Sequence, residues 1–324
     1  EMSLINGENK VERVLAIYQM LTNGESVNKR ELADRFHVNE RTIQRDIEDI
    51  RVYLEESQET VGGSGTIVYR HKEKGFRLMN DVKKMSGGEL LAVSKILLES
   101  RAFTKEELEP IMEKLVFNCV PPSERKQAGE LLSNERYHYI EPHHHTRILH
   151  SLWELGGAVR TQRYVKIWYK KLSEEKPVVR TVKPVGIMFS EFYFYLIAFI
   201  ERKADEPQYL SPAIYRIDRI QSYKILNDHF FVPYKDRFEE GEFRKRVQFM
   251  FGGRLQRIIF EYSGMSLEAV LDRLPTAAVL EERKEEETGK KIYTIRAEVF
   301  GDGIDMWLRG QGDKVRVLSR KILE

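Results

Sequence analysis

The sequence contains one cysteine, Cys119, among 324 residues. A single cysteine can form neither an internal disulfide bond nor a cysteine-based zinc site, and we interpret Cys119 as a small buried apolar residue. The sequence also lacks any run of about 18 apolar residues, so we predict no membrane-spanning helix. It lacks the apolar core of a secretion signal as well. We therefore expect a cytoplasmic protein with no membrane partner.

The sequence also has no large excess of positive or negative charge. The chain carries 53 Lys and Arg residues against 51 Asp and Glu residues, for a net charge of +2 at pH 7. In residues 1–80 the acidic residues slightly outnumber the basic ones. Any DNA binding must therefore come from basic side chains placed on one face, because bulk attraction is weak.

Sequence motifs of common enzymes are also missing. There is no Gly-Lys-Ser/Thr phosphate loop, no Gly-x-Ser-x-Gly elbow and no His-Glu-x-x-His motif. Residues 62–65 are Gly-rich but precede a predicted strand, whereas a dinucleotide-binding turn precedes a helix. In a helix His143-His144-His145 would point about 100° apart, so they could not all ligate one ion. We predict no catalytic residues, no cofactor and no metal site; the enzyme alternative is a nucleotide-hydrolysing pocket around Tyr195.

What the sequence does contain is a strong helical pattern after Asn39, a preferred N-cap residue. Apolar residues recur at steps of four, three and four along one face: Ile43, Ile47, Ile50 and Leu54. Side chains of the first two turns that suit guanine, adenine and phosphate lie off that face: Arg41, Thr42, Gln44 and Arg45. Acidic residues offset the basic ones along this helix: Glu40, Asp46, Glu48 and Asp49 against Arg41, Arg45 and Arg51.

Two shorter helices are predicted before this one. Residues 10–22 form the first, which ends at Asn23-Gly24. Asn28 can cap the second, and Glu31 three residues later completes a capping box. Two helices, a tight turn and a third helix form the helix-turn-helix layout, whose last helix enters the major groove of DNA. The alternative is a plain three-helix bundle with no role in DNA binding.

Residues 66–71 and 75–79 are strand-like runs around a charged turn, and they predict the β-hairpin "wing" of a winged helix. Basic side chains gather there: Arg70, His71, Lys72, Lys74 and Arg77. They suit contacts with DNA phosphates or the minor groove. A solvated charged turn is the alternative. Residues 60–65 are predicted to be a flexible connector.

This first block resembles the winged helix-turn-helix of DeoR-like bacterial transcription regulators over residues 10–80. The matching residues are Leu32-Ala33, Phe36, Val38, Arg41-Thr42-Ile43, Arg45-Asp46-Ile47 and Gly75-Phe76-Arg77-Leu78. The resemblance implies that the first turns of the third helix face the major groove. The predicted DNA-binding residues are Asn39, Glu40, Arg41, Thr42, Gln44, Arg45, Arg70, His71, Lys72 and Lys74.

Residues 81–162 have a helical pattern. Ser86 with Glu89 and Thr104 with Glu107 each have the spacing of a capping box. Residues 121–123 begin another short helix, and 147–155 continue the pattern. These helices could bridge two domains or pair two subunits.

From residue 163 the pattern becomes strand-like, with predicted strands at 164–170, 178–189, 192–201 and 214–226. Short consecutive strands favour a small antiparallel barrel or sandwich. In the third strand, alternation puts one wholly apolar set on a core face: Phe194, Leu196, Ala198 and Ile200. The other face carries two phenol hydroxyls and suits a partly wet surface: Tyr193, Tyr195, Ile197 and Phe199.

Basic residues lie around this strand: Arg180, Lys183, Arg216 and Arg219. A positive pocket edged with tyrosines suits an anionic or nucleotide ligand. The alternative is a core strand with ordinary surface arginines. A regular strand sends Arg216 and Arg219 to opposite faces, so both reach one ligand only where the strand bulges or ends between them. Tyr195 and Arg216 are therefore the favoured ligand contacts.

Residues 194–199, Phe-Tyr-Leu-Ile-Ala-Phe, resemble the motif that names the WYL domain, with Phe at the Trp position. Arg180, residues 184–186 and residues 215–220 match its flanking strands. The substitution of Phe for Trp keeps an apolar filler and loses only an indole N–H. The resemblance implies an Sm-like β-barrel that senses nucleic acids or nucleotide-like effectors. The predicted ligand-binding residues are Tyr193, Tyr195, Arg180, Lys183, Arg216 and Arg219.

The last region alternates strands and helices. Strands are predicted at 247–251, 257–262, 277–283, 291–300 and 314–318, and helices at 266–274 and 304–308. This mixed order predicts a small ferredoxin-like α+β unit, and it resembles the extension that follows WYL domains.

The sequence thus predicts a multidomain α+β protein. Its predicted parts are a winged helix-turn-helix at 1–80, a helical linker or dimerisation region at 81–162, a WYL barrel (Sm-like or SH3-like) at 163–235 and an α+β extension at 236–324. We predict a sequence-specific transcription regulator that binds operator DNA as a homodimer. Its effector would be a nucleotide or a single-stranded nucleic acid. The alternative among binding proteins is a WYL protein that binds single-stranded nucleic acid directly, with the winged helix as a targeting domain.

Overall fold

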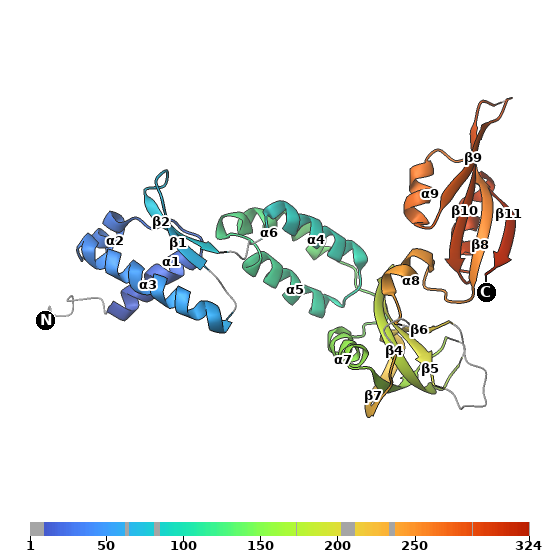
Figure 1. Cartoon of the computed structure of the whole chain (residues 1–324), viewed down its shortest axis with the longest axis horizontal. Coiled ribbons are helices and arrows are strands. Elements are labelled where there is room, and N and C mark those ends of the chain that lie inside the picture. Colours follow the sequence, from blue (N-terminus) through green and yellow to red (C-terminus); the bar gives the residue numbers. More distant parts are fainter. Residues whose placement is uncertain are drawn as a thin grey trace. The chain divides into compact units, whose positions relative to one another are not determined.

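The computed structural model describes residues 10–61, 65–80, 85–172, 174–201, 211–232, 237–286 and 288–323. The chain forms two compact units (Figure 1). The first comprises Glu1–Glu99 and Leu108–Ile140, and the second comprises Ser100–Glu107 and Glu141–Glu324. The short segment Ser100–Glu107 therefore folds with the second unit, although the helices on either side of it continue into the first.

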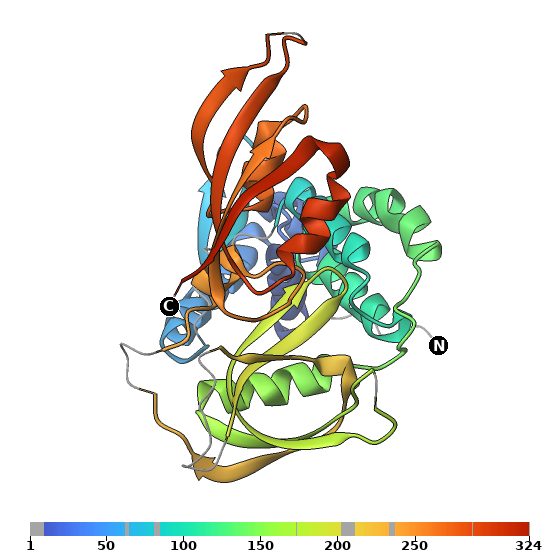
Figure 2. The same ribbon diagram turned by 90° about the vertical axis from the view of Figure 1, so that its right-hand side faces the viewer.

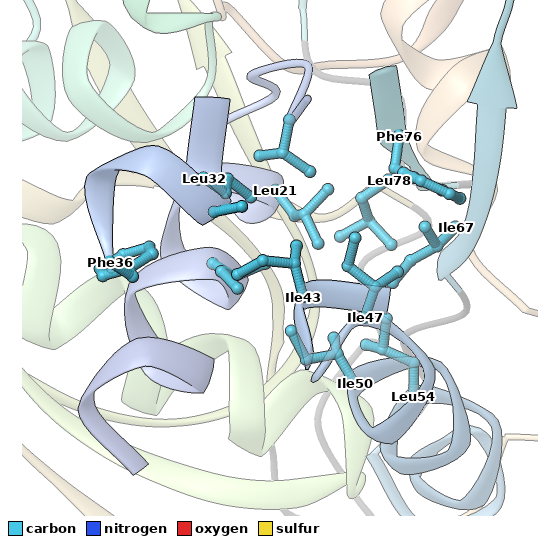
Figure 3. Close-up of a cluster of buried hydrophobic side chains, with 13 residues drawn as sticks. Leu21, Leu32, Phe36, Ile43, Ile47, Ile50, Leu54, Ile67, Phe76 and Leu78 are labelled. Carbon is cyan, nitrogen blue, oxygen red and sulfur yellow. The ribbon is translucent and has the colours of Figure 1, made fainter. Parts of the chain in front are cut away.

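The first unit begins with three helices and a hairpin: α1 (Lys10–Thr22), α2 (Lys29–Arg35), α3 (Glu40–Val61), β1 (Gly65–Arg70) and β2 (Gly75–Asn80). The four apolar residues of the predicted face of α3 are buried: Ile43, Ile47, Ile50 and Leu54. They pack with Leu21 of α1, Leu32 of α2 and Phe76 of β2, as Figure 3 shows. The periodicity of α3 therefore encodes the core that holds all these elements together. Helix α3 continues to Val61, into the stretch predicted as a connector.

The hairpin is fixed to the start of α2. Val27 and Phe76 exchange two backbone hydrogen bonds of 2.8 Å each. Asn28 accepts hydrogen bonds from the N–H groups of Arg30 and Glu31, which makes it the predicted N-cap, and its Nδ2 donates to the carbonyl of Lys74 at 2.8 Å. Gly75 is required here, because a Cβ atom would lie 2.9 Å from the backbone oxygen of Val27. The wing is therefore held at a fixed position relative to α2.

Three further helices follow: α4 (Gly87–Ser100), α5 (Lys105–Asn118) and α6 (Pro122–Tyr137). The predicted capping box at the start of α4 is formed, since Ser86 N–H donates to the Glu89 carboxylate at 2.7 Å and Glu89 N–H donates to the Ser86 hydroxyl at 3.3 Å. Lys95 pairs with Glu135, and this ion pair ties α6 to α4.

The second unit contains α7 (Leu149–Arg160) and an antiparallel sheet of five strands: β3 (Arg163–Tyr169), β4 (Val178–Ser190), β5 (Tyr193–Ile200), β6 (Ala213–Arg216) and β7 (Ile220–His229). Their order is β6-β5-β4-β3-β7. Figure 2 shows α7, in green, lying along the strands of this sheet. The prediction of one strand over 214–226 is wrong, because the 3-10 turn η1 (Ile217–Arg219) divides it into β6 and β7.

The second face of β5 is drier than predicted. Ile197 on that face is fully buried and packs with Met188 of β4 and Phe243 of α8 (Glu240–Arg246). On this face Tyr193, Tyr195 and Phe199 keep partial exposure, whereas Ile197 does not. Helix α8 was not predicted, because Phe243 is its single buried residue and the rest of its sequence is charged or glycine.

A second antiparallel sheet completes the chain, with the elements β8 (Leu255–Tyr262), α9 (Leu267–Arg273), β9 (Ala278–Lys284), β10 (Lys291–Phe300), α10 (Ile304–Gly310) and β11 (Val315–Ile322). Its strand order is β11-β8-β10-β9. Val270 of α9 and Ile304 of α10 pack into one core with Phe260 of β8, so both helices cover the same face of the sheet. The predicted strand at 247–251 is wrong: Phe249 and Met250 have φ values of 49° and 56°, which a strand excludes.

Candidate DNA-recognition surface and ligand site

Helix α3 begins with a capped N-terminus. The Asn39 side chain accepts hydrogen bonds from the N–H of Thr42 at 2.8 Å and from its hydroxyl at 3.0 Å. Asn39 is therefore the N-cap that the sequence predicts. Thr42 is half-buried and its hydroxyl is engaged in this cap, so its side chain has less freedom to contact a base than the sequence alone suggests.

Two arginines dominate the outer surface of the first turns of α3. Arg41 and Arg45 are exposed and lie one helical turn apart, while Gln44 between them is half-buried. Within the described part of the chain, neither arginine has an ion-pair partner. Because a free guanidinium can bind guanine or phosphate with two hydrogen bonds, these side chains can take part in DNA recognition without first breaking an internal contact.

The acidic residues of α3 interfere less with this surface than the sequence suggests. Asp46 is 1% exposed and accepts hydrogen bonds from Arg13 of α1 at 2.6 and 3.3 Å. Asp49 pairs with Lys10 at 2.8 Å, and Glu48 pairs with Arg51. The interpretation that Asp46 offsets the exposed arginines is therefore corrected: its carboxylate lies in the interior and is neutralised by Arg13.

The wing carries exposed basic side chains at the predicted positions: Arg70, His71, Lys72 and Lys74. Lys74 has a φ of 48°, the left-handed conformation of a tight turn. Arg77 instead forms an ion pair with Glu73 at 3.3 Å and is half-buried. The charge available at the tip therefore comes mainly from Lys72 and its neighbours.

In the second unit, the sheet register brings the favoured ligand residues together. Tyr195 of β5 lies opposite Arg216 of β6, so their side chains share one face of the sheet. The Arg216 guanidinium carbon lies 3.3 Å from the centre of the Tyr193 ring. Arg216 also donates two hydrogen bonds to the Asp218 carboxylate, at 3.1 and 2.8 Å. A tyrosine, an arginine and a carboxylate thus form one compact polar cluster.

Arg219 is close enough to act electrostatically on Tyr195, because β6 ends after Arg216 and the chain turns there. The pKa of Tyr195 is raised to about 12, mainly by burial, and Arg216 and Arg219 both act to lower it. The strand is interrupted at η1, between Arg216 and Arg219. Both side chains can therefore act on the same face of the sheet. The Tyr195 hydroxyl therefore stays protonated at neutral pH and can donate a hydrogen bond to an anion.

His144 also belongs to this cluster. Its ring lies 6.1 Å from the ring of Tyr193, and its Nδ1 accepts a hydrogen bond from the N–H of Thr146 at 2.9 Å. Burial lowers the pKa of His144, while Asp218 opposes that effect. The neutral imidazole therefore carries its proton on Nε2 and offers a donor there. In the sequence this residue stands out only as one of three consecutive histidines.

The three histidines make different contacts. His145 Nδ1 lies 2.7 Å from the Glu141 carboxylate, and His143 is exposed. Among the residues that the structure describes, no group of three His, Cys, Asp or Glu side chains could hold a metal ion.

Arg180 and Lys183 lie apart from this cluster. Lys183 is opposite Phe199 in the register of the sheet, and its Nζ lies 5.7 Å from the centre of the Tyr164 ring. Arg180 acts on Tyr215, whose pKa burial raises to about 12 and Arg180 lowers. Because Tyr215 precedes Arg216 in β6, its side chain points to the opposite face of the sheet. Arg180 therefore lies near Tyr215 and Lys183 beside Tyr164, and neither joins the cluster around Arg216.

Two protein families match parts of the chain. The HTH domain family matches residues 13–58, and the WYL domain family matches residues 151–225. The chain therefore contains an HTH domain and a WYL domain, the combination of a DNA-binding regulator of transcription. The resemblance drawn from the sequence is confirmed on both counts.

Two solved structures have similar chains. One is the proteasome accessory factor B/C (PafBC) of Arthrobacter aurescens, with 14% identity over 96% of this chain and a TM-score of 0.28. This chain spans 44% of the length of that protein. The other is a CRISPR Cas-related protein, with 12% identity, 71% of this chain and 74% of that chain covered, and a TM-score of 0.22. No curated protein matches the sequence. Within the described residues, no helix is long and apolar enough to cross a membrane.

Proposed function

We propose that the protein is a sequence-specific transcription regulator whose WYL domain binds a nucleotide or single-stranded nucleic-acid effector and thereby alters operator binding. The observation that carries this proposal is the state of α3. Arg41 and Arg45 are exposed and unpaired within the described residues, while Asp46 on the same helix is buried against Arg13. The helix is thus anchored to the domain core on one face and presents guanidinium groups on the other.

We also infer the finer architecture of the second unit. β6 ends at Arg216 and β7 begins at Ile220, yet these are the two outermost strands of the five-stranded order. A link of three residues between outermost strands favours a sheet that curls into an Sm-like barrel. The later sheet has the element order β-α-β-β-α-β and the strand order β11-β8-β10-β9, which supports a ferredoxin-like unit.

The protein would act on its operator as a homodimer. One recognition helix reads only a few base pairs, and the modest charge of the chain supplies little general attraction. Two copies on two half-sites add their binding free energies, so operator affinity would depend on the spacing of the two helices. Light scattering of the free protein and of its operator complex would test this, and a monomer on a palindromic operator would contradict it.

The two faces of β5 offer a route from the ligand to the helices. Tyr193 contacts Arg216 and His144 on one face. The residues on either side of Tyr193 contact another segment. Arg101 lies 5.6 Å from the Phe192 ring, and the Phe103 ring lies 5.7 Å from the Phe194 ring. Arg101 and Phe103 belong to the turn between α4 and α5. Movement of β5 on ligand binding would shift this turn and change the populations of two domain arrangements.

Selection of bound DNA from a random pool, with and without candidate nucleotides, would test the whole proposal. It would give the site, its symmetry and its ligand dependence in one experiment. Arg41→Ala and Arg45→Ala should each lower the affinity for the selected DNA site by about tenfold or more. Lys126→Ala, which removes an exposed charge from α6, serves as the matched control. If both arginine variants bind with unchanged affinity, α3 is not the recognition helix.

A second candidate function is direct binding of single-stranded nucleic acid by the WYL domain. The stacked pair of Arg216 and Tyr193 favours it, because bases stack on both side-chain types. Under this function, an oligonucleotide would bind with the same affinity whether or not operator DNA is present. Under the regulator function, the two affinities are coupled in both directions.

A further inference from the structure

The cation best placed to bind an anionic effector is already occupied. Arg216 donates from Nε and Nη2 to the two oxygens of Asp218, at 3.1 and 2.8 Å. This is the two-point geometry in which a guanidinium binds a carboxylate or a phosphate. The side chains of Arg216 and Asp218 are 17% and 5% exposed. An anion that enters beside Tyr193 therefore meets a cation whose fork is filled from within the chain.

The surroundings of this pair offer more donors than Asp218 uses. Tyr195 lies opposite Arg216 in the sheet, its hydroxyl is protonated, and the residue is partly exposed. The imidazole of His144 leaves Nε2–H free of the Thr146 contact. Arg219 follows Asp218 directly. A carboxylate has two oxygens, whereas a nucleotide's terminal phosphate has three unesterified ones and a single-stranded backbone presents several phosphates in succession. Such a ligand can therefore satisfy donors that Asp218 leaves without an anionic partner.

We propose that Asp218 is an internal competitor for the effector, so that a ligand phosphate group replaces the Asp218 carboxylate on Arg216. This proposal rests on the proposed function, because it specifies how the effector site is filled. Asp218 would thereby set how tightly an anion must bind Arg216 in order to act as an effector. An anion held by Arg216 alone would fail to displace it, and a phosphate that engages Arg216, Arg219 and the neighbouring donors would succeed. The ligand class is a phosphate carried by a nucleotide or by a single-stranded nucleic-acid backbone.

The position of Asp218 makes its displacement consequential. It is the middle residue of η1, the only link between β6 and β7. The N–H of Lys170, just after β3, donates to the carbonyl of Arg219 in the same turn at 3.0 Å. Release of Asp218 would therefore free a turn that joins three strands. The occupied and displaced states differ in one ion pair, which is the kind of local change that can bias a larger equilibrium.

The test measures phosphate binding by the full chain. The probes are a fluorescein-labelled ten-nucleotide oligo(dT), followed by anisotropy, and thymidine monophosphate, followed by calorimetry. Asp218→Asn removes the charge and keeps the shape, and we expect it to bind the probe about tenfold more tightly because the competitor is lost. Arg216→Gln should lose binding. Asp313→Asn, which removes an exposed carboxylate far along the sequence, should bind like the wild type.

The outcomes separate the inference from the function on which it rests. Tighter binding by Asp218→Asn supports the competitor role. An effect on oligo(dT) alone assigns the phosphate to a single-strand backbone, and an equal effect on thymidine monophosphate shows that one nucleotide suffices. Unchanged or weaker binding in a folded Asp218→Asn variant overturns the inference, and weaker binding would make Asp218 a positioning residue for Arg216. If neither the wild type nor Asp218→Asn binds either probe, the effector function itself fails.

Folding of the variants can be checked independently of binding. Trp153, Trp168 and Trp307 are the three tryptophans of the chain and all lie in the second unit. Their fluorescence during urea denaturation therefore reports on the unit that contains Asp218. A variant whose denaturation midpoint matches the wild type is a valid subject for the binding comparison.

Discussion

Arg13 of α1 donates to Asp46 of α3 at 2.6 Å, and the two residues are 7% and 1% exposed. This buried ion pair joins the first helix of the winged domain to α3, the proposed recognition helix. It also removes an acidic charge from the surface beside Arg41 and Arg45. The pair therefore affects both the stability of the domain and the charge of the proposed DNA-binding surface.

Arg13→Ala should destabilise the winged domain strongly, because it leaves the Asp46 carboxylate buried without its partner. We expect a loss of about 3–5 kcal/mol in the free energy of unfolding. The measurement is urea denaturation followed by helical circular dichroism, since the tryptophans report only on the second unit. Lys10→Ala is the matched control: it breaks an exposed pair with Asp49 on the same two helices and should cost about 1 kcal/mol or less. If both variants lost the same free energy of unfolding, burial of the Arg13–Asp46 pair would not be the reason for its contribution.

The wing and the recognition helix should contribute to DNA binding in different ways. Lys72→Ala removes an exposed cation at the tip of the wing. If that cation contacts phosphate, the variant should lose affinity for all sequences alike, and the slope of log affinity against log salt should fall by about one. Arg45→Ala should instead relax the preference for one base position. A base-specific effect of Lys72→Ala would place the wing in a groove and not on the backbone.

The winged domain could be predicted from sequence because its information is local. The steps between Ile43, Ile47, Ile50 and Leu54 define a buried face, and Asn28 and Asn39 mark two helix starts. Each signal lies within one or two helical turns, where the geometry of the backbone decides which side chains meet. The partner of Asp46 could not be predicted in this way, since Arg13 is 33 residues away in the sequence.

The ligand cluster was only partly predictable for the same reason. Strand parity placed Tyr193 with Tyr195, and the need for a strand break between Arg216 and Arg219 was evident from their spacing. The break itself was not predicted, because the strand-forming residues Ile214, Tyr215, Ile217 and Ile220 continue across it. His144 comes from a loop before α7 and reaches Tyr193 through tertiary packing alone. No period in the sequence connects these two residues.

Glu107 should stabilise the second unit by capping a helix other than its own. It is 8% exposed, and its carboxylate accepts hydrogen bonds from the N–H groups of Ile148 and Leu149 at 2.8 and 2.9 Å, where α7 begins. Glu107→Ala leaves the buried N–H of Ile148 unsatisfied and removes the partner of the Leu149 N–H, and it should cost about 2 kcal/mol. Tryptophan fluorescence during urea denaturation measures this. Glu106→Ala breaks an exposed pair with Arg147 one residue earlier and should have a small effect; a comparable loss there would show that helix capping is not the cause.

His144 should make the stability of the second unit depend on pH. Burial lowers its pKa in the folded protein below the usual 6.5. The folded state therefore binds a proton at this imidazole less readily than the unfolded state does. Both states are neutral at this site well above pH 6.5, and the free energy of unfolding is then unaffected. As the pH falls from 6.5 through the lowered pKa, the unfolded state binds more protons, and the stability of the folded state declines.

His144→Gln should remove this part of the decline, because the amide oxygen can still accept from the Thr146 N–H and has no proton to gain. The comparison is the difference in unfolding free energy between wild type and variant, measured by tryptophan fluorescence at pH 7.5 and at pH 5.5. We expect the difference to shift in favour of His144→Gln at the lower pH. His143→Gln, which changes an exposed histidine next to it, should leave the pH profile as it is. A difference that stays constant between the two pH values would mean that the imidazole of His144 remains hydrated, and that its Nε2–H is not held in the cluster around Tyr193 and Arg216.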